Sequence, residues 1–199
     1  MRIKVCFLLA AVLLCFAACN APSEETGPGV EEPVAYDLLT DEDIRMLMPD
    51  LVDRALEIYS MFNGVGFNMD LDETMPENGS YTLIADSGFT NMSDLKNAVE
   101  SVFSKECAEY LFYSRYINVP DDIGLPLYKE HAGRLYGNID NGGHGYAMEW
   151  FADSSIIIYQ EPGFLEVMIP VKIYGEDDKR IVIIKNVNGK WLFTGPLLY

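Results

Sequence analysis

The chain has 199 residues, of which 31 are acidic and 14 are basic, so its formal charge at pH 7 is −17. Phosphate binding needs a basic surface, so this acidity argues against a nucleic-acid partner. An anionic membrane surface would repel the chain, and its natural electrostatic complement is a basic protein. Acidity by itself is explained more simply as a means of keeping the protein soluble.

The first 18 residues have the pattern of an export signal. Arg2 and Lys4 precede an uncharged apolar run from Val5 to Ala18. This run is shorter than the roughly 20 apolar residues that cross a membrane, and small residues at its end are typical of processing. The residues Phe16-Ala17-Ala18-Cys19 resemble a bacterial lipobox, with Phe at the position where Leu is usual.

This resemblance implies that residues 1–18 are removed and that Cys19 carries lipid. Removal takes away two basic residues and no acidic one, which would leave a formal charge of −19. Two acyl chains would hold the protein at the outer face of the bacterial cell membrane, because one chain alone binds only marginally. The alternative is an ordinary signal peptide cut after Ala18, with Cys19 left as a free thiol.

Processing would also settle the state of the four cysteines. Cys6 and Cys15 would leave with the signal and Cys19 would be acylated, so Cys107 would have no partner for a disulfide. Cys107 stands in a helical pattern of apolar residues. We therefore interpret it as a buried packing residue rather than a redox residue.

The rest of the chain is predicted to be a tether followed by one domain. Residues 19–35 are rich in Pro, Gly and Glu and have no hydrophobic periodicity, which is typical of a flexible tether. Residues 36–199 suit a single domain with its own core. No internal repeat or second linker divides them.

The first half of this domain has helical periodicity. Apolar residues recur at helical spacing up to Phe62, after an acidic first turn that Thr40 can cap. Pro49 predicts a break or kink, with a longer helix from Asp50 to Phe62. Residues 67–80 are predicted to form a polar loop.

Three more elements complete this half. Tyr81 to Ala85 is predicted to be a short strand. Ser93 is expected to cap a second helix, and Ser104 a third helix from Lys105 to about Arg115.

The chain changes character after Pro120. Short apolar or alternating runs are joined by turn residues such as Asn188-Gly189, which is typical of an antiparallel meander. Helices first and strands later predict an α+β fold, with the helices packed on one face of a strongly bent sheet. The expected strands are Leu127–Glu130, Arg134–Tyr136, Tyr146–Phe151, Ser155–Gln160, Phe164–Tyr174, Arg180–Asn186 and Trp191–Thr194.

Residue patterns give little support to an enzyme or a metal site. Ser93 and Lys96 match the Ser-x-x-Lys of penicillin-recognising enzymes, but the companion Ser-Asp-Asn and Lys-Thr-Gly elements are absent. Asp70-x-Asp72 lacks the glycine and the final glutamate of a calcium loop. His131 has no second ligand at zinc-type spacing. We therefore predict no enzymatic activity, no metal and no cofactor.

Residues 138–145, which are rich in Gly and Asn, are the candidate contact region. A glycine-rich hairpin tip can insert into the groove of a protein partner. Asn138, Asp140, Asn141 and His144 are therefore the candidate partner-binding residues. The alternative is a plain hairpin without a binding role.

Several segments resemble the IseA-type family of DL-endopeptidase inhibitors. Pro126–Glu130 and Gly133–Tyr136 are similar to the centre of that family. Asp94–Lys96 and Val102–Ser104 are similar to its helical part, and Asn188–Trp191 to its last hairpin. The resemblance spans the whole expected domain. The Gly-Lys-Trp hairpin also occurs in cystatin-like and NTF2-like domains.

The resemblance implies an extracytoplasmic protein that binds cell-wall endopeptidases of the NlpC type, blocks their catalytic cleft and hydrolyses nothing itself. The lipid anchor is a departure from the family, because it would fix the domain at the membrane. Two other functions stay open. An NTF2-like module that binds a small ligand at the cell surface would need an apolar cavity. A hydrolase with clustered carboxylates would need two inward-facing acids about 5–10 Å apart.

Overall fold

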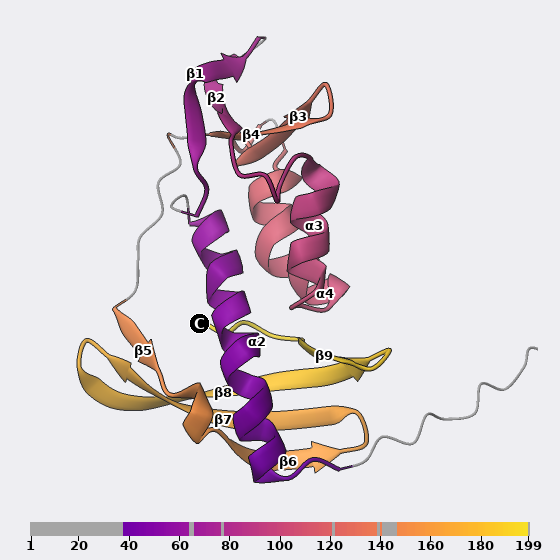
Figure 1. The fold of residues 1–199 in the computed structure, drawn as a ribbon, viewed down its shortest axis with the longest axis vertical. Helices are drawn as coiled ribbons and strands as arrows, with labels where there is room; N and C mark the ends of the chain where they lie inside the picture. Colours follow the sequence, from indigo (N-terminus) through magenta and orange to yellow (C-terminus); the bar gives the residue numbers. More distant parts are fainter. Residues whose placement is uncertain are drawn as a thin grey trace, which may run out of the picture. The chain divides into compact units, whose positions relative to one another are not determined.

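The computed structural model describes residues 38–63, 66–76, 78–120, 122–138, 140 and 147–198. They belong to one compact unit, Tyr36–Tyr199. Its helices and antiparallel strands confirm the predicted α+β fold, and the strands form two sheets where one was expected (Figure 1). The predicted signal peptide, Cys19 and the predicted tether lie outside the described residues.

Helix α2 (Asp41–Phe62) begins as the sequence predicts. The Thr40 hydroxyl accepts the N–H of Asp43, and the Asp43 carboxylate accepts the N–H of Thr40, so both ends of a capping box are present. The predicted break at Pro49 is wrong. Proline removes one helical hydrogen bond, but buried side chains on both sides of it, such as Met48 and Leu51, keep one continuous helix of 22 residues.

Helix α2 connects the two sheets (Figure 1). At its start the Asp41 carboxylate accepts the N–H of Ile157 at 3.0 Å, and the Leu39 backbone exchanges two hydrogen bonds of 3.1 Å with the Gln160 side chain. Near its end the carbonyl of Met61 accepts the hydroxyl of Tyr128. A helix of this length extends for about 33 Å, so each sheet is fastened to a different end of it.

The small sheet has the strand order β1-β2-β4-β3 and is antiparallel throughout. Asp70 of β1 pairs with Leu83 and Thr74 pairs with the next residue, Thr82, so residues 71–73 leave the ladder as a bulge. The polar loop predicted at 67–80 is wrong, because strands β1 and β2 occupy most of it. The strands are β1 (Met69–Met75), β2 (Asn78–Ile84), β3 (Tyr128–His131) and β4 (Arg134–Asn138).

The large sheet has the order β5-β7-β8-β9, with β6 also paired to β7. It confirms the predicted meander, including the turn at Asn188 and Gly189, whose φ angles are 53° and 83°. A 3₁₀ turn, η2 (Ala152–Ser154), joins β5 to β6. The strands are β5 (Met148–Trp150), β6 (Ile156–Glu161), β7 (Phe164–Ile173), β8 (Glu176–Val187) and β9 (Lys190–Phe193).

Two shorter helical segments precede the second half of the small sheet. Asn91, not Ser93, caps α3 (Met92–Glu100), because the Asn91 side chain accepts the N–H of Asp94 at 3.0 Å. Ser104 caps α4 (Lys105–Ala108) as predicted. The chain then continues as a π-helix, η1 (Glu109–Ile117), where an α-helix was expected.

The main core lies between the helices and the inner face of the large sheet. Aromatic rings fill its centre, with centroids of Phe103 and Phe112 at 5.2 Å and of Phe103 and Phe193 at 5.7 Å. A second, smaller cluster forms on the outer face of the small sheet, from Met75, Tyr81, Leu83 and Tyr136. The small sheet is therefore buried on both faces over part of its area.

Candidate functional site

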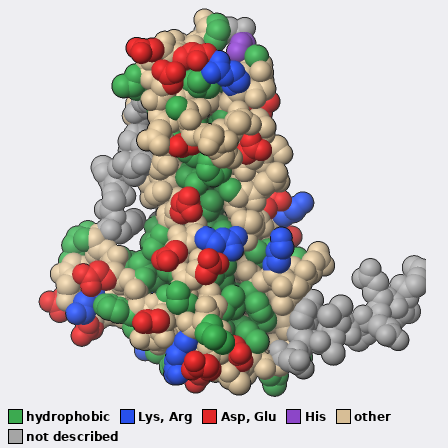
Figure 2. Space-filling view, viewed as in Figure 1, with side chains coloured by type: hydrophobic (Ala, Val, Ile, Leu, Met, Phe, Trp, Pro, Cys, Tyr) green, Lys and Arg blue, Asp and Glu red, His purple; other side chains and the backbone are tan. Residues whose placement is uncertain are grey.

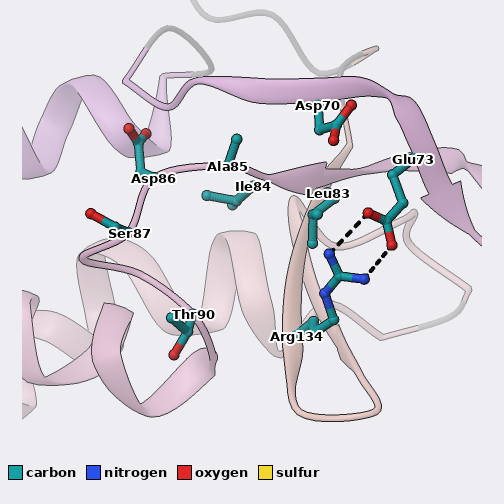
Figure 3. A pocket seen from close by; sticks show the side chains of 9 residues that line it. All are labelled: Asp70, Glu73, Leu83, Ile84, Ala85, Asp86, Ser87, Thr90 and Arg134. Atoms are coloured by element: carbon teal, nitrogen blue, oxygen red, sulfur yellow. Dashed lines mark hydrogen bonds and ion pairs between the residues drawn. The ribbon is translucent and has the colours of Figure 1, made fainter.

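A surface cleft of about 430 Å³ lies beside the bulge of β1 (Figure 3). Its apolar lining comes from the end of β2 and the residue after it, including Leu83 and Ala85. Its charged lining consists of three carboxylates and one guanidinium, so the formal charge of the cleft is −2. The charged residues are Asp70, Glu73, Asp86 and Arg134.

Arg134 and Glu73 form a two-pronged ion pair across the cleft (Figure 3). Both terminal nitrogens of the guanidinium donate to the carboxylate, and the Nη2–Oε2 distance is 2.9 Å. The hydrogen bond from Arg134 lowers the pKa of Glu73 below its ordinary value. Glu73 therefore stays ionised at neutral pH, where it can accept hydrogen bonds but cannot donate a proton. The pair also fastens the bulge to the start of β4.

The other two carboxylates shape the backbone around the cleft. Asp70 accepts the N–H of Asp72 at 3.1 Å, which holds the turn of the bulge. Asp86 accepts both the backbone N–H and the side-chain amide of Asn68, each at 2.8 Å. The cleft is thus built by local hydrogen bonds as well as by the ion pair.

We name residues 70–73, Asp-Leu-Asp-Glu, the acidic bulge. Leu71 projects from it and is 73% exposed. β1 is an edge strand of the small sheet, and bulges at such edges redirect side chains away from the ladder. Figure 2 shows acidic side chains gathered beside a basic group at the top of the view, over β1 and the β3–β4 hairpin. The acidic bulge thereby exposes an apolar side chain among carboxylates.

The predicted contact residues are only partly within the described chain. Asn138 is at the end of β4 and only 4% exposed; its side-chain oxygen accepts the N–H of Asp140 at 3.0 Å. Asp140 is exposed. Asn141 and His144 lie outside the described residues. Asn138 therefore forms a turn toward Asp140, and the partner-binding role of all four residues stays a prediction.

The sequence does not predict the acidic bulge, because its pattern gives Asp70 and Asp72 only as part of an incomplete calcium loop. The missing information is the pairing of Glu73 with Arg134, because 61 residues separate them. The run of acids on a segment that precedes a strand was the one local signal available. It does not distinguish a solvated loop from a bulged edge strand.

The other residues considered for catalysis, Ser93, Lys96 and Cys107, have positions that fit structural roles. Ser93 is exposed on α3, and the Nζ of Lys96 lies 5.1 Å from the centre of the Tyr113 ring. Cys107 is 5% exposed, which confirms the predicted buried position. Burial raises the pKa of its thiol to about 11, so it is protonated and a poor nucleophile at neutral pH.

Two features are absent from the residues that the structure describes. Among them, no group of three or more His, Cys, Asp or Glu side chains could hold a metal ion. Within the same ranges, no helix combines the length and apolar character needed to cross a membrane.

Neither family models nor curated proteins supply a relative of this chain, because no protein-family model and no curated protein matches it. The resemblance to IseA-type inhibitors therefore rests on the quoted segments and stays a prediction.

Proposed function

We propose that this chain is a lipid-anchored extracytoplasmic protein that binds peptidoglycan DL-endopeptidases of the NlpC type and inhibits them by covering the catalytic cleft. The proposed location rests on the lipobox-like residues ending at Cys19. The proposed class of partner rests on the IseA-type resemblance and on the acidity of the chain. The proposed mode of contact rests on the acidic bulge.

The observation that carries this proposal is the exposure of Leu71 on a segment that the fold holds in place. Glu73 is tied to Arg134 on β4, and Asp72 is tied to Asp70 within the bulge. A contact segment that is already ordered loses little conformational entropy when it binds. The surrounding carboxylates would attract a basic partner and speed the encounter.

The described core gives no support to the small-ligand alternative. That function needs an apolar cavity with a few inward polar groups. The space between the helices and the large sheet is instead filled by Phe103, Phe112 and Phe193, each at most 1% exposed. The charged residues that line the cleft beside the acidic bulge have a formal charge of −2, which suits a basic protein surface better than an apolar metabolite.

The test is cleavage of peptidoglycan by an NlpC-type endopeptidase domain from the same organism. Residues 36–199 would be added in increasing amounts, and released muropeptides would be measured. We expect a dose-dependent loss of cleavage that weakens as salt is raised, because charge steers the encounter. Undiminished cleavage in the tens-of-micromolar range, against several such enzymes, would overturn the proposal.

A paired variant identifies the contact surface. The double substitution Leu71→Ser and Asp72→Asn should weaken inhibition roughly tenfold, which corresponds to about 1.4 kcal/mol of binding free energy. The matched control is Tyr174→Ser with Glu176→Gln, which removes an exposed apolar residue and an exposed acid at the end of the large sheet. Equal inhibition by both variants would leave the inhibitor proposal standing but move the contact away from the acidic bulge.

A further inference from the structure

The face of the large sheet that is directed away from α2 is rich in exposed apolar side chains. Along β7 the buried residues alternate with less buried ones, so Leu165, Val167 and Ile169 face the core and the residues between them face outward. Strand pairing then assigns the outward residues of β6 and β8. The outer patch consists of Ile156, Tyr159, Met168, Pro170, Ile181 and Ile183.

The patch is continuous across three strands. Ile156, Met168 and Ile181 form one row, because Met168 pairs with both of the others. Ile181 is 56% exposed and Tyr159 is 51% exposed. Scattered apolar residues on a surface need no explanation, but a contiguous group of this kind marks an interaction surface.

The charges on the same face are balanced. The outward acidic residues of β6, β7 and β8 are Glu161, Glu166 and Asp177, and the outward basic residues are Lys172, Lys179 and Lys185. Their formal charges cancel, whereas the whole chain carries −17. Two copies of this acidic chain repel each other across most orientations, and this face is one on which that repulsion is removed.

The spacing of these charges is also symmetric about the central row. On β8, Lys185 lies four residues after Ile181 and Asp177 lies four residues before it. On β7, Lys172 lies four residues after Met168 and Phe164 lies four residues before it. A two-fold axis along this row would place Lys185 of one copy opposite Asp177 of the other. It would also place Lys172 opposite the ring of Phe164.

We propose that the outer patch is the contact between two copies of this chain, which pair face to face around such an axis. The apolar row forms the centre of the interface and the Lys185–Asp177 pairs form its rim, the usual arrangement of a protein interface. Three strands over eight residue steps give a footprint of roughly 400 Å² per copy. That is about half of a standard interface, so the dimer is weak and depends on concentration.

The first experiment measures mass by light scattering or sedimentation equilibrium. Residues 36–199 are used, since they form one compact unit with its own core. The average mass should rise toward twice the monomer value between about 5 and about 500 µM, as expected for a weak interface. A constant monomer mass over this range would overturn the proposal.

The second experiment locates the contact. Ile181→Asp should keep the protein monomeric throughout, and Ile183→Ser, a milder change, should shift dimerisation to several-fold higher concentration. Leu71→Asp places the same charge on an exposed apolar residue of the small sheet, and it should leave dimerisation unchanged. Far-ultraviolet circular dichroism checks that each variant is folded. Equal effects of Ile181→Asp and Leu71→Asp would contradict a contact at the outer patch.

The third experiment tests the symmetry itself. Lys185→Glu and Asp177→Lys should each abolish self-association, because each puts like charges opposite one another. A mixture of the two variants should dimerise again, because both rim contacts then join unlike charges. A mixture that stays monomeric, while the wild type dimerises, would overturn the proposed axis. These results do not depend on whether the chain inhibits an endopeptidase.

Discussion

The two sheets of this protein pack on the same helical core but differ in how they are built. In the large sheet, β7 and β8 pair from Phe164–Lys185 to Ile173–Glu176 without a shift in register. In the small sheet, the ladder between β1 and β2 is interrupted twice, and an ion pair holds the bulge that results. The large sheet presents a neutral apolar face around its regular β7–β8 ladder, whereas the small sheet presents an acidic edge at its interrupted β1–β2 ladder.

This contrast shows what each kind of pairing requires. A regular ladder follows from alternating side chains, whose period of two directs every second residue to the core. A bulged edge follows from contacts that are distant in sequence, such as Glu73 with Arg134. Regular pairing therefore depends on the core beneath it, and irregular pairing depends on a few polar contacts.

The largest expected difference concerns apolar burial in the two sheets. Leu165→Ala removes a 1% exposed side chain from the main core and should lower the free energy of unfolding by about 3–5 kcal/mol. Leu83→Ala acts in the four-residue cluster of the small sheet, where Leu83 is 8% exposed, and should lower it by about 2 kcal/mol. Urea unfolding measures both. A larger loss for Leu83→Ala would reverse the comparison.

The next largest effect concerns the hydrogen bonds that attach each sheet to α2 or to the residues just before α2. Tyr128→Phe removes the buried hydroxyl that donates to the Met61 carbonyl and leaves that carbonyl with one hydrogen-bond partner fewer, which should cost about 1–2 kcal/mol of unfolding free energy. Gln160→Ala removes two partly buried hydrogen bonds to Leu39 at the large sheet, and should cost about 1 kcal/mol because water can replace them.

Thermal and urea unfolding of these two variants check the order. Tyr110→Phe is the control for loss of a tyrosine hydroxyl. Because Tyr110 is 64% exposed, this substitution should change the free energy of unfolding little. The attachment of the small sheet would be the weaker one if Gln160→Ala proved more damaging than Tyr128→Phe.

The smallest expected effect concerns how the stability of the protein depends on pH. Because Arg134 lowers the pKa of Glu73, the ion pair contributes stability above the ordinary glutamate pKa of 4.5, and this contribution is lost as the pH falls through the lowered value. The melting temperature of wild type should therefore exceed that of Glu73→Gln at pH 7, and the difference should shrink in strong acid. Glu161→Gln, on the large sheet, is the control. A difference independent of pH would contradict the ion pair as its source.

The sequence predicts every strand of the large sheet and three of the four strands of the small sheet, and it misses β1. Alternation along 164–173 and the Asn188-Gly189 turn were sufficient for β7 and the last hairpin. β1 escaped prediction because its outward side chains are acidic and its bulge breaks the period of two. The helical cap at Thr40 was visible because a capping box is local, whereas the continuity of α2 through Pro49 depends on the buried residues around it.

The residues of the candidate site also differ in whether their contacts are local or distant in the sequence. A local glycine-rich pattern predicts Asn138 and Asp140 as contact residues, and the turn that joins them is also local. The cleft beside the acidic bulge combines residues 70–90 with Arg134, and no spacing rule links segments so distant. The outer patch needs the register of three strands, which alternation alone does not give.

The fastening of Leu39 to Gln160 has a mechanical consequence. Leu39 stands at the start of the described chain, and its two hydrogen bonds join it to a strand 121 residues away. A pull on the residues before Leu38 therefore reaches β6 directly, and the Asp41–Ile157 contact shares the load. Tension from the amino terminus would be borne first by the large sheet, while the small sheet and its acidic bulge, at the other end of α2, would keep their shape.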